Sequence, residues 1–277
     1  MDNQTLIAAY FARIGLPGIS GADLASLHAL VAAQRLAIPF ENLDIPLGRG
    51  VRIDRQAITA KLLHQRRGGY CYEQNGLLGM ALAALGFMQR PLLARVRLGL
   101  PEDACPPRTH VMQLVDIDGE SWIADAGFGG SFVPPMRLAD GELRETADGV
   151  GHRLVRQSAL GSAAGQWLLQ RRAPGKADWD AQYSFDLAEV APDDVQMANH
   201  WTSTRPGTRF TDNVIASRVL PDGFIALTGR QLSKSCGEAQ DKQDIQTAEQ
   251  LHGVLQHDFG ICLTPAEAAT LFAFAGQ

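Results

Sequence analysis

Residues 67–75 read Arg67-Gly68-Gly69-Tyr70-Cys71-Tyr72-Glu73-Gln74-Asn75 and place a cysteine between a glycine pair and an apolar run. Apolar side chains recur at helical spacing from Leu77 to Leu85, so the stretch predicts a turn and then a helix that begins near Cys71. A thiol at a helix N-terminus lies at the positive end of the helix dipole, which favours the ionised thiolate. The glycines permit a sharp turn and a close approach of substrate, and the first helical amides could stabilise an oxyanion. These features predict a nucleophile at Cys71.

The residues before this stretch predict three further helices. Apolar side chains repeat every three or four residues over 6–14 and again over 24–31, where the pattern ends before Pro39. A third helix follows Asp54 and stops at the glycine pair. The first 87 residues therefore predict a helical bundle that carries Cys71.

After Pro91 the hydrophobic period changes from that of a helix to that of a strand. Short runs of residues with this pattern predict strands at 94–98, 110–117, 120–126, 152–157, 166–172 and 182–187. A flexible turn is predicted at Gly161–Gly165. Many short strands in sequence favour an antiparallel meander or barrel over residues 88–187.

A predicted hairpin in this region brings two polar residues to one face. If Asp118-Gly119 is a two-residue turn, the numbers of opposed residues sum to 237, so Met112 faces Asp125. His110 and Asp125 are then diagonal neighbours, roughly 7–8 Å apart at Cα. A register slip of one residue would put them on opposite faces. A thiolate nucleophile needs an imidazole, and the imidazole needs an orienting group, so the pair predicts partners for Cys71.

The last part of the chain mixes helices and strands. A short helix is expected over about 193–200, followed by a loop at 204–207 and a hairpin that turns at 221–223. Two helices close the chain, and Thr264-Pro265-Ala266-Glu267 opens the second with a capping box. The whole sequence predicts an α+β fold in three domains, over residues 1–87, 88–187 and 188–277.

Composition limits the compartment and the partners. The net charge is −5 and the pI about 5.8, so no overall basic field would gather nucleic acid or anionic lipid. The N-terminus lacks the features of a signal peptide, and no apolar run approaches the roughly 20 residues that span a bilayer. The four cysteines form no CxxC pair, so we expect cytoplasmic thiols and no metal site. No coiled coil or repeat indicates an oligomeric state.

Several segments together resemble one family. Arg67–Asn75 resembles the signature of the arylamine N-acetyltransferases. Tyr10–Ile14, Ile38–Leu43, Asp125–Gly129 and Thr202–Phe210 resemble other segments of that family, in the same order along nearly the whole chain. There is no large insertion, so the sequence is similar to the shorter bacterial members.

The resemblance implies a helical bundle, a β-barrel and an α/β lid, with a cysteine-protease-like Cys-His-Asp core. It implies ping-pong transfer of acetyl from acetyl-CoA to an arylamine, arylhydrazine or N-arylhydroxylamine. Cys71, His110 and Asp125 match the catalytic triad, Phe128 the acceptor pocket, and Gly129, Thr208 and Phe210 the surroundings of the CoA arm. An aromatic acceptor also needs a ring-lined cleft, to which Tyr70 and Tyr72 could contribute.

Other readings remain open at this point. Arg13, Glu41 and Arg67 are interpreted as a buried ion-pair network that braces the Cys71 loop. The same triad chemistry serves a thiol hydrolase or a transglutaminase-like amidase, or an acyl synthase that closes an amide within one large substrate. A binding protein that kept the fold without catalysis is the alternative outside enzymes.

Overall fold

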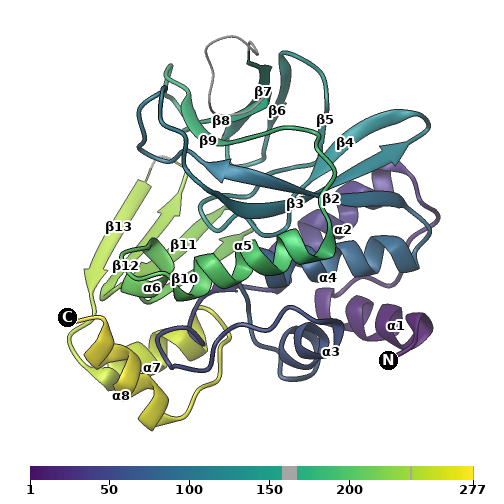
Figure 1. Cartoon of the computed structure of the whole chain (residues 1–277). Coiled ribbons are helices and arrows are strands. Elements are labelled where there is room, and N and C mark those ends of the chain that lie inside the picture. Colours follow the sequence, from purple (N-terminus) through teal and green to yellow (C-terminus); the bar gives the residue numbers. More distant parts are fainter. Residues whose placement is uncertain (158–166, 238, 277) are drawn as a thin grey trace.

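A computed structural model describes residues 1–157, 167–237 and 239–276 and shows an α+β fold (Figure 1). Helices near the N-terminus pack beside a large antiparallel sheet, and a smaller sheet with two helices lies at the C-terminal end. None of the helices in the described ranges combines the length and apolar character needed to cross a membrane. The turn predicted at Gly161–Gly165 lies outside the described residues.

The N-terminal helices appear where the sequence predicts them. They are α1 (Asn3–Ile14), α2 (Leu24–Ala37), α3 (Arg55–Ile58), the π-helical turn η1 (Thr59–His64) and α4 (Cys71–Ala84). Asp2, Asp23 and Asp54 cap α1, α2 and α3 by accepting from backbone amides in the first turn. Fully buried leucines from α1, α2, η1 and α4 form a shared core. The third helix continues into a π-helical turn, which the sequence pattern does not predict.

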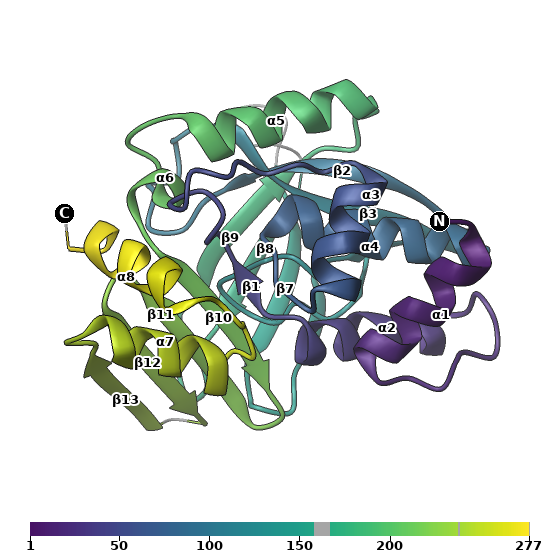
Figure 2. The same ribbon diagram turned by 90° about the horizontal axis from the view of Figure 1, so that it is seen from below.

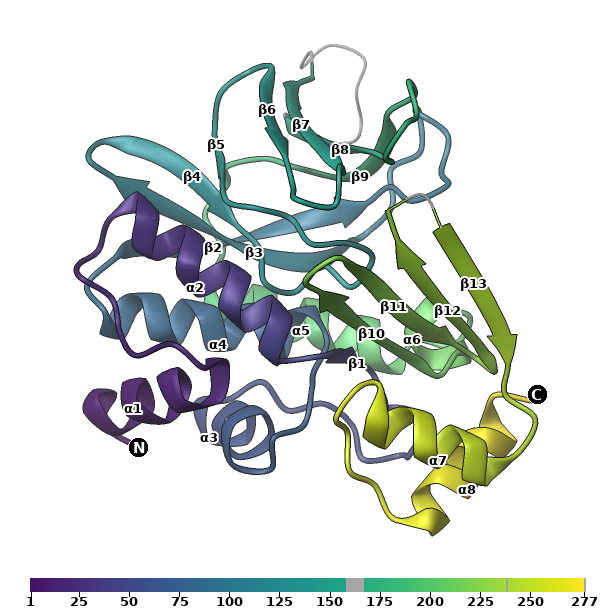
Figure 3. The same ribbon diagram turned by 180° about the vertical axis from the view of Figure 1, so that it is seen from behind.

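The large sheet forms a nearly closed barrel. Its strands are β2 (Met88–Val96), β3 (Arg108–Ile117), β4 (Glu120–Ala124), β5 (Met136–Arg137), β6 (Glu142–Glu145), β7 (Gly151–Arg156), β8 (Trp167–Arg172) and β9 (Asp180–Phe185). They run in the order β5-β4-β3-β2-β9-β8-β7-β6, and the two edge strands lie side by side (Figure 3). Arg137 on β5 and Glu142 on β6 approach to 4.0 Å across that gap.

Strand β2 begins earlier than predicted, before Pro91 rather than after it. Proline cannot donate a ladder hydrogen bond, and it is tolerated here because β9 pairs with β2 only at Ala94–Val96.

The predicted β3–β4 hairpin is confirmed with its register. Gln113 pairs with Ala124 and Ile117 with Glu120, as a two-residue turn requires. Asp118 and Gly119 have φ values of 53° and 80°, which place both turn residues in the left-handed region of a type I′ turn. His110 and Asp125 therefore come from the two arms of this hairpin.

The second sheet contains β1 (Phe40–Glu41), β10 (Ile215–Leu220), β11 (Gly223–Thr228), β12 (Gln231–Cys236) and β13 (Ala239–Asp244), in that order. Helices α7 (Ala248–His257) and α8 (Pro265–Phe274) cover one of its faces (Figure 2). The predicted capping box at Thr264 and Glu267 is confirmed. Strand β1 lies within the N-terminal region of the sequence but pairs with β10, so it joins that region to the second sheet.

Helix α5 (Pro192–Thr204) extends four residues beyond the predicted helix and is followed by the short helix α6 (Arg209–Asp212). The sequence pattern does not predict α6, the short strands β1, β5 and β6, or the polar strands β12 and β13. The helix α6 and the strands β1, β5 and β6 are too short to show a period, and β12 and β13 carry too few apolar side chains to indicate a strand. The domain limits at residues 87 and 187 remain a prediction.

Candidate functional site

Cys71 is the first residue of α4 and is 3% exposed. Glu73 fixes this helix start, since its Oε2 accepts from the Tyr70 amide at 3.0 Å. The chain after β4 passes directly beside the cysteine. A Cβ at Gly127 would lie 2.9 Å from the Cys71 Cα, so only glycine permits this close approach.

His110 lies on β3 beneath this loop and is 2% exposed. Its Nε2 is 2.7 Å from the Asp125 Oδ2. Burial disfavours the imidazolium, but the Asp125 charge and hydrogen bond, together with Cys71, outweigh burial and raise the pKa of His110 from 6.5 to about 10. The structure therefore brings Cys71, His110 and Asp125 together.

Asn75, one turn after Cys71 on α4, holds the carboxylate in place. Asp125 Oδ1 accepts from Asn75 Nδ2 at 2.9 Å and from the Gly127 amide at 2.9 Å. Asn75 also donates to the Val111 carbonyl at 2.6 Å, which fixes the side chain to β3. Burial alone would raise the pKa of Asp125, but His110 and these donors hold it below its usual range. The sequence did not predict this bridge, although Asn75 stands within residues 67–75.

Buried charges brace the loop before Cys71. Glu41 is fully buried, and its Oε1 accepts from Arg67 at 2.8 and 2.9 Å. Lys61 joins the same network through Asp44 at 2.7 Å and Glu73 at 2.8 Å. The predicted Glu41–Arg67 pair is thus present.

The predicted role of Arg13 in that network is wrong. Arg13 donates instead to the backbone carbonyls of Leu62 at 2.9 Å and Ala37 at 2.7 Å. These carbonyls lie at the ends of η1 and α2, where helices leave carbonyls without an internal partner, so the guanidinium caps two helices.

A second buried guanidinium supports the loop after Asp125. Arg35 on α2 is 1% exposed and donates to the carbonyls of Ala126, Phe128 and Ser131 at 3.4, 3.1 and 3.3 Å. Among the described residues no carboxylate forms an ion pair with it. Its bonds therefore tie the 126–131 loop to the helical bundle.

A partly open cavity of about 220 Å³ is lined by Cys71 and His110. The predicted residues Phe128, Gly129, Thr208 and Phe210 line it. The other described residues that line it are Phe40, Val96, Leu98, Pro107, Thr109, Gly127, Gly130, Trp201, Thr202, Arg209 and Ile215. We call this space the Cys71 cavity. Its walls come from the bundle, the barrel, α5, α6 and β10, so its lining could not be read from one segment.

Tyr70 and Tyr72 do not line the Cys71 cavity, where the sequence predicts them. Both rings are buried behind Cys71, with centroids 5.3 Å apart. Their hydroxyls face α5, where Tyr70 bonds to Asn199 and Tyr72 lies 3.4 Å from Thr202. The tyrosines therefore attach α5 to the start of α4.

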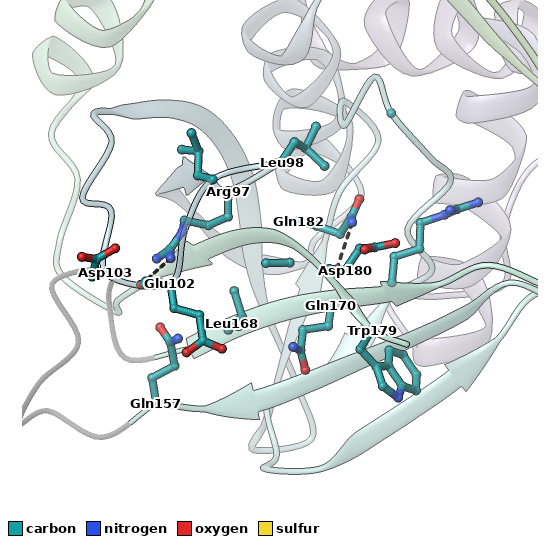
Figure 4. Close-up of a pocket in the computed structure, with 15 residues that line it drawn as sticks. Arg97, Leu98, Glu102, Asp103, Gln157, Leu168, Gln170, Trp179, Asp180 and Gln182 are labelled. Atoms are coloured by element: carbon teal, nitrogen blue, oxygen red, sulfur yellow. Dashed lines mark hydrogen bonds between the residues drawn. The ribbon is translucent and has the colours of Figure 1, made fainter. Parts of the chain in front are cut away.

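A larger cavity of about 800 Å³ lies against the barrel and shares Leu98 and Gly130 with the Cys71 cavity. Figure 4 shows that Glu102, Gln170 and Trp179 surround it. Arg97, beside it, donates to the carbonyls of Pro101 and Glu102. No cysteine or histidine is among the described residues that line it, so the reactive groups lie in the smaller cavity.

Fold and site together define an α+β protein in which a buried Cys-His-Asp arrangement faces an apolar cavity. A family model described as N-acetyltransferase matches residues 23–268. An arylamine N-acetyltransferase of Escherichia coli strain K12 is 37% identical over 261 residues, covering 93% of this chain and 89% of that protein. The chain belongs to the arylamine N-acetyltransferase family.

Solved structures agree with this assignment. The arylamine N-acetyltransferase from Salmonella typhimurium matches with a TM-score of 0.89 and 35% identity, over 97% of this chain and 98% of that one. The Mycobacterium marinum enzyme in complex with CoA matches with a TM-score of 0.87 and 30% identity, over 96% and 98% of the two chains. The three-part fold expected from the sequence is therefore confirmed.

Proposed function

We propose that this protein transfers an acetyl group from acetyl-CoA through a thioester on Cys71 to an arylamine, an arylhydrazine or an N-arylhydroxylamine. The observation that carries the proposal is the Cys71 thiol at the floor of an apolar cavity, beside an imidazole held by Asp125 at 2.7 Å. The cytosol keeps thiols reduced, as the proposed role of Cys71 needs, so we place the enzyme in the cytoplasm.

The first half-reaction loads the enzyme. With a pKa of about 10, His110 is protonated at neutral pH, and its positive charge stabilises a Cys71 thiolate. The thiolate attacks the thioester carbonyl of acetyl-CoA, a carbon–sulfur bond to Cys71 forms, and the bond to the CoA sulfur breaks. The departing CoA thiolate takes the proton from His110. One thioester replaces another, so the step is close to isoenergetic and reversible.

The second half-reaction discharges the enzyme. The amine nitrogen attacks the acetyl carbon on Cys71, a carbon–nitrogen bond forms, and the carbon–sulfur bond breaks. Neutral His110 takes the proton from the amine and becomes the imidazolium that again stabilises the Cys71 thiolate. Because Asp125 occupies Nε2, the proton moves through Nδ1.

The Cys71 cavity suits this pair of substrates. The rings of Phe40, Phe128 and Phe210 offer an aromatic acceptor apolar walls. Gly129, Thr208 and Phe210 are proposed to contact the CoA arm. A volume of about 220 Å³ suits an acceptor of about one ring, which disfavours an acyl synthase that must enclose one large substrate.

Intact-protein mass spectrometry after brief mixing with acetyl-CoA tests the proposal. We expect an acetyl increment in the wild type that an added arylamine removes. Cys71→Ala should show none, whereas Cys262→Ala, which removes an exposed thiol, should behave as the wild type. A wild type with a reduced Cys71 and no increment would contradict acetyl-CoA as donor. Rapid hydrolysis of acetyl-CoA without an amine would favour a thiol hydrolase.

A further inference from the structure

The Cys71 cavity has one feature that acetyl transfer to a simple arylamine does not require. Arg209, the first residue of α6, lines it. Of the described residues that line the cavity, Arg209 is the only one whose side chain carries a permanent charge. Neutral aromatic rings need no charged partner in the cavity that binds them. The few polar groups in a ligand-binding cavity normally orient the ligand.

The charge of Arg209 has no counterpart within the described part of the chain. Arg67 and Arg108 pair with Glu41 and Asp186, but no described carboxylate forms an ion pair with Arg209. Desolvation by the surrounding residues lowers the pKa of Arg209, and an arginine guanidinium stays protonated in proteins. Arg209 is exposed, and its guanidinium, which has no ion-pair partner among the described residues, is available to whatever occupies the cavity.

A guanidinium recognises carboxylates and phosphates with two parallel hydrogen bonds. We propose that Arg209 binds an anionic group of a substrate in the Cys71 cavity, either a carboxylate on the acceptor ring or a phosphate of the donor. This inference rests on the proposed function, because it assumes that both substrates enter this cavity. It predicts that Arg209 sets substrate preference and has no part in the chemical step.

The acceptor is tested on enzyme already acetylated by a small, phosphate-free acetyl thioester such as S-acetyl-N-acetylcysteamine. Discharge by 4-aminobenzoate is compared with discharge by its neutral counterpart 4-aminobenzamide. If the acceptor carries the anion, Arg209→Gln slows discharge by 4-aminobenzoate about 10-fold through KM and leaves the amide within about 2-fold. Arg209→Lys should retain most of the preference, because it keeps the charge.

The donor is tested by the rate of loading. If a donor phosphate contacts Arg209, Arg209→Gln slows loading by acetyl-CoA about 10-fold and leaves loading by the phosphate-free thioester unchanged. Lys242→Gln is the control. It removes one positive charge from an exposed position on β13, and Lys242 does not line the cavity.

A slower rate in Arg209→Gln that is confined to discharge by 4-aminobenzoate, or to loading by acetyl-CoA, supports the inference. It also identifies which substrate carries the anionic group. Equal rates in wild type and Arg209→Gln for all four reactants overturn it, and so does an equal loss of rate in Lys242→Gln. If the wild type accepts no acetyl group, or if neither amine discharges it, the proposed function itself fails and this inference fails with it.

Discussion

Replacing Asp125 with asparagine should change which nitrogen of His110 carries the proton. Asp125 Oδ1 accepts from Asn75 Nδ2 and from the Gly127 amide, so the new side chain must keep its oxygen at that position. Its NH₂ group then faces His110 Nε2, which must become an acceptor. The proton of the neutral ring then lies on Nδ1, so this nitrogen can no longer accept a proton from Cys71.

The expected loss follows from the same geometry. Without the carboxylate, burial dominates and moves the pKa of His110 below 6.5 instead of raising it to about 10. The imidazolium that stabilises the thiolate is lost at neutral pH. We expect acetyl loading to slow by about 1,000-fold to 10,000-fold, or roughly 4–5 kcal/mol of transition-state free energy, as when the orienting aspartate of a catalytic triad becomes asparagine.

Stability should respond to pH in a matching way. Because the pKa of His110 is raised, this group contributes stability that is fully present below about pH 6.5 and is lost as the pH rises through about 10. Because the pKa of Asp125 is lowered, this group contributes stability that is present above about pH 3.8 and is lost as the pH falls below that value. The melting temperatures of wild type and Asp125→Asn should therefore differ most between about pH 4 and 6.5.

Two measurements check this reasoning. Single-turnover loading by acetyl-CoA gives the rate, and the ultraviolet absorbance of the thiolate gives the ionisation of Cys71, both across pH. Asp178→Asn removes an exposed carboxylate and serves as control. An unchanged thiolate signal at neutral pH in a folded Asp125→Asn variant would refute the proposed coupling of His110 to Cys71.

Three further changes probe the support of the site. Gly127→Ala would place a Cβ 2.5 Å from Asn75 Nδ2, so we expect loading to fall at least about 10-fold, measured by mass spectrometry. Glu41→Gln removes the closer of the two carboxylates that pair with the buried Arg67 and leaves only Asp44 at 3.3 Å, so it should lower the free energy of unfolding by about 3 kcal/mol, with activity falling in parallel. Arg35→Met leaves three buried carbonyls without a donor and should cost about 2–3 kcal/mol in denaturant titration, with a raised KM for the acceptor.

Control variants, or results that would contradict the prediction, accompany each of these three changes. Gly253→Ala, within α7 and with 3.9 Å to its nearest neighbour, should keep full activity. Glu120→Gln breaks an exposed ion pair and should change stability by less than about 1 kcal/mol. Activity lost in Glu41→Gln at an unchanged melting point would contradict a bracing role. An unchanged acceptor KM in Arg35→Met would show that the 126–131 loop keeps its position without Arg35.

The sequence by itself determined the features that depend on neighbours along the chain. A glycine pair before an apolar helical run places Cys71 at a helix start, and α4 begins at that residue. The Asp118-Gly119 turn fixes the register of one hairpin, and parity then puts His110 and Asp125 on one face. Period and turn chemistry are local, because they follow from backbone geometry over a few residues.

Tertiary structure decided which distant residues meet. Arg13 and Arg35 are both buried arginines, yet each donates to backbone carbonyls on other elements and not to a carboxylate. The aromatic residues beside Cys71 turn toward α5, while Arg209, far along the chain, reaches the cavity. A side chain's partner is set by how helices and strands pack, and a buried polar group bonds to whatever packing places within reach. That choice is absent from any single segment, so only the folded chain assembles the walls of the Cys71 cavity.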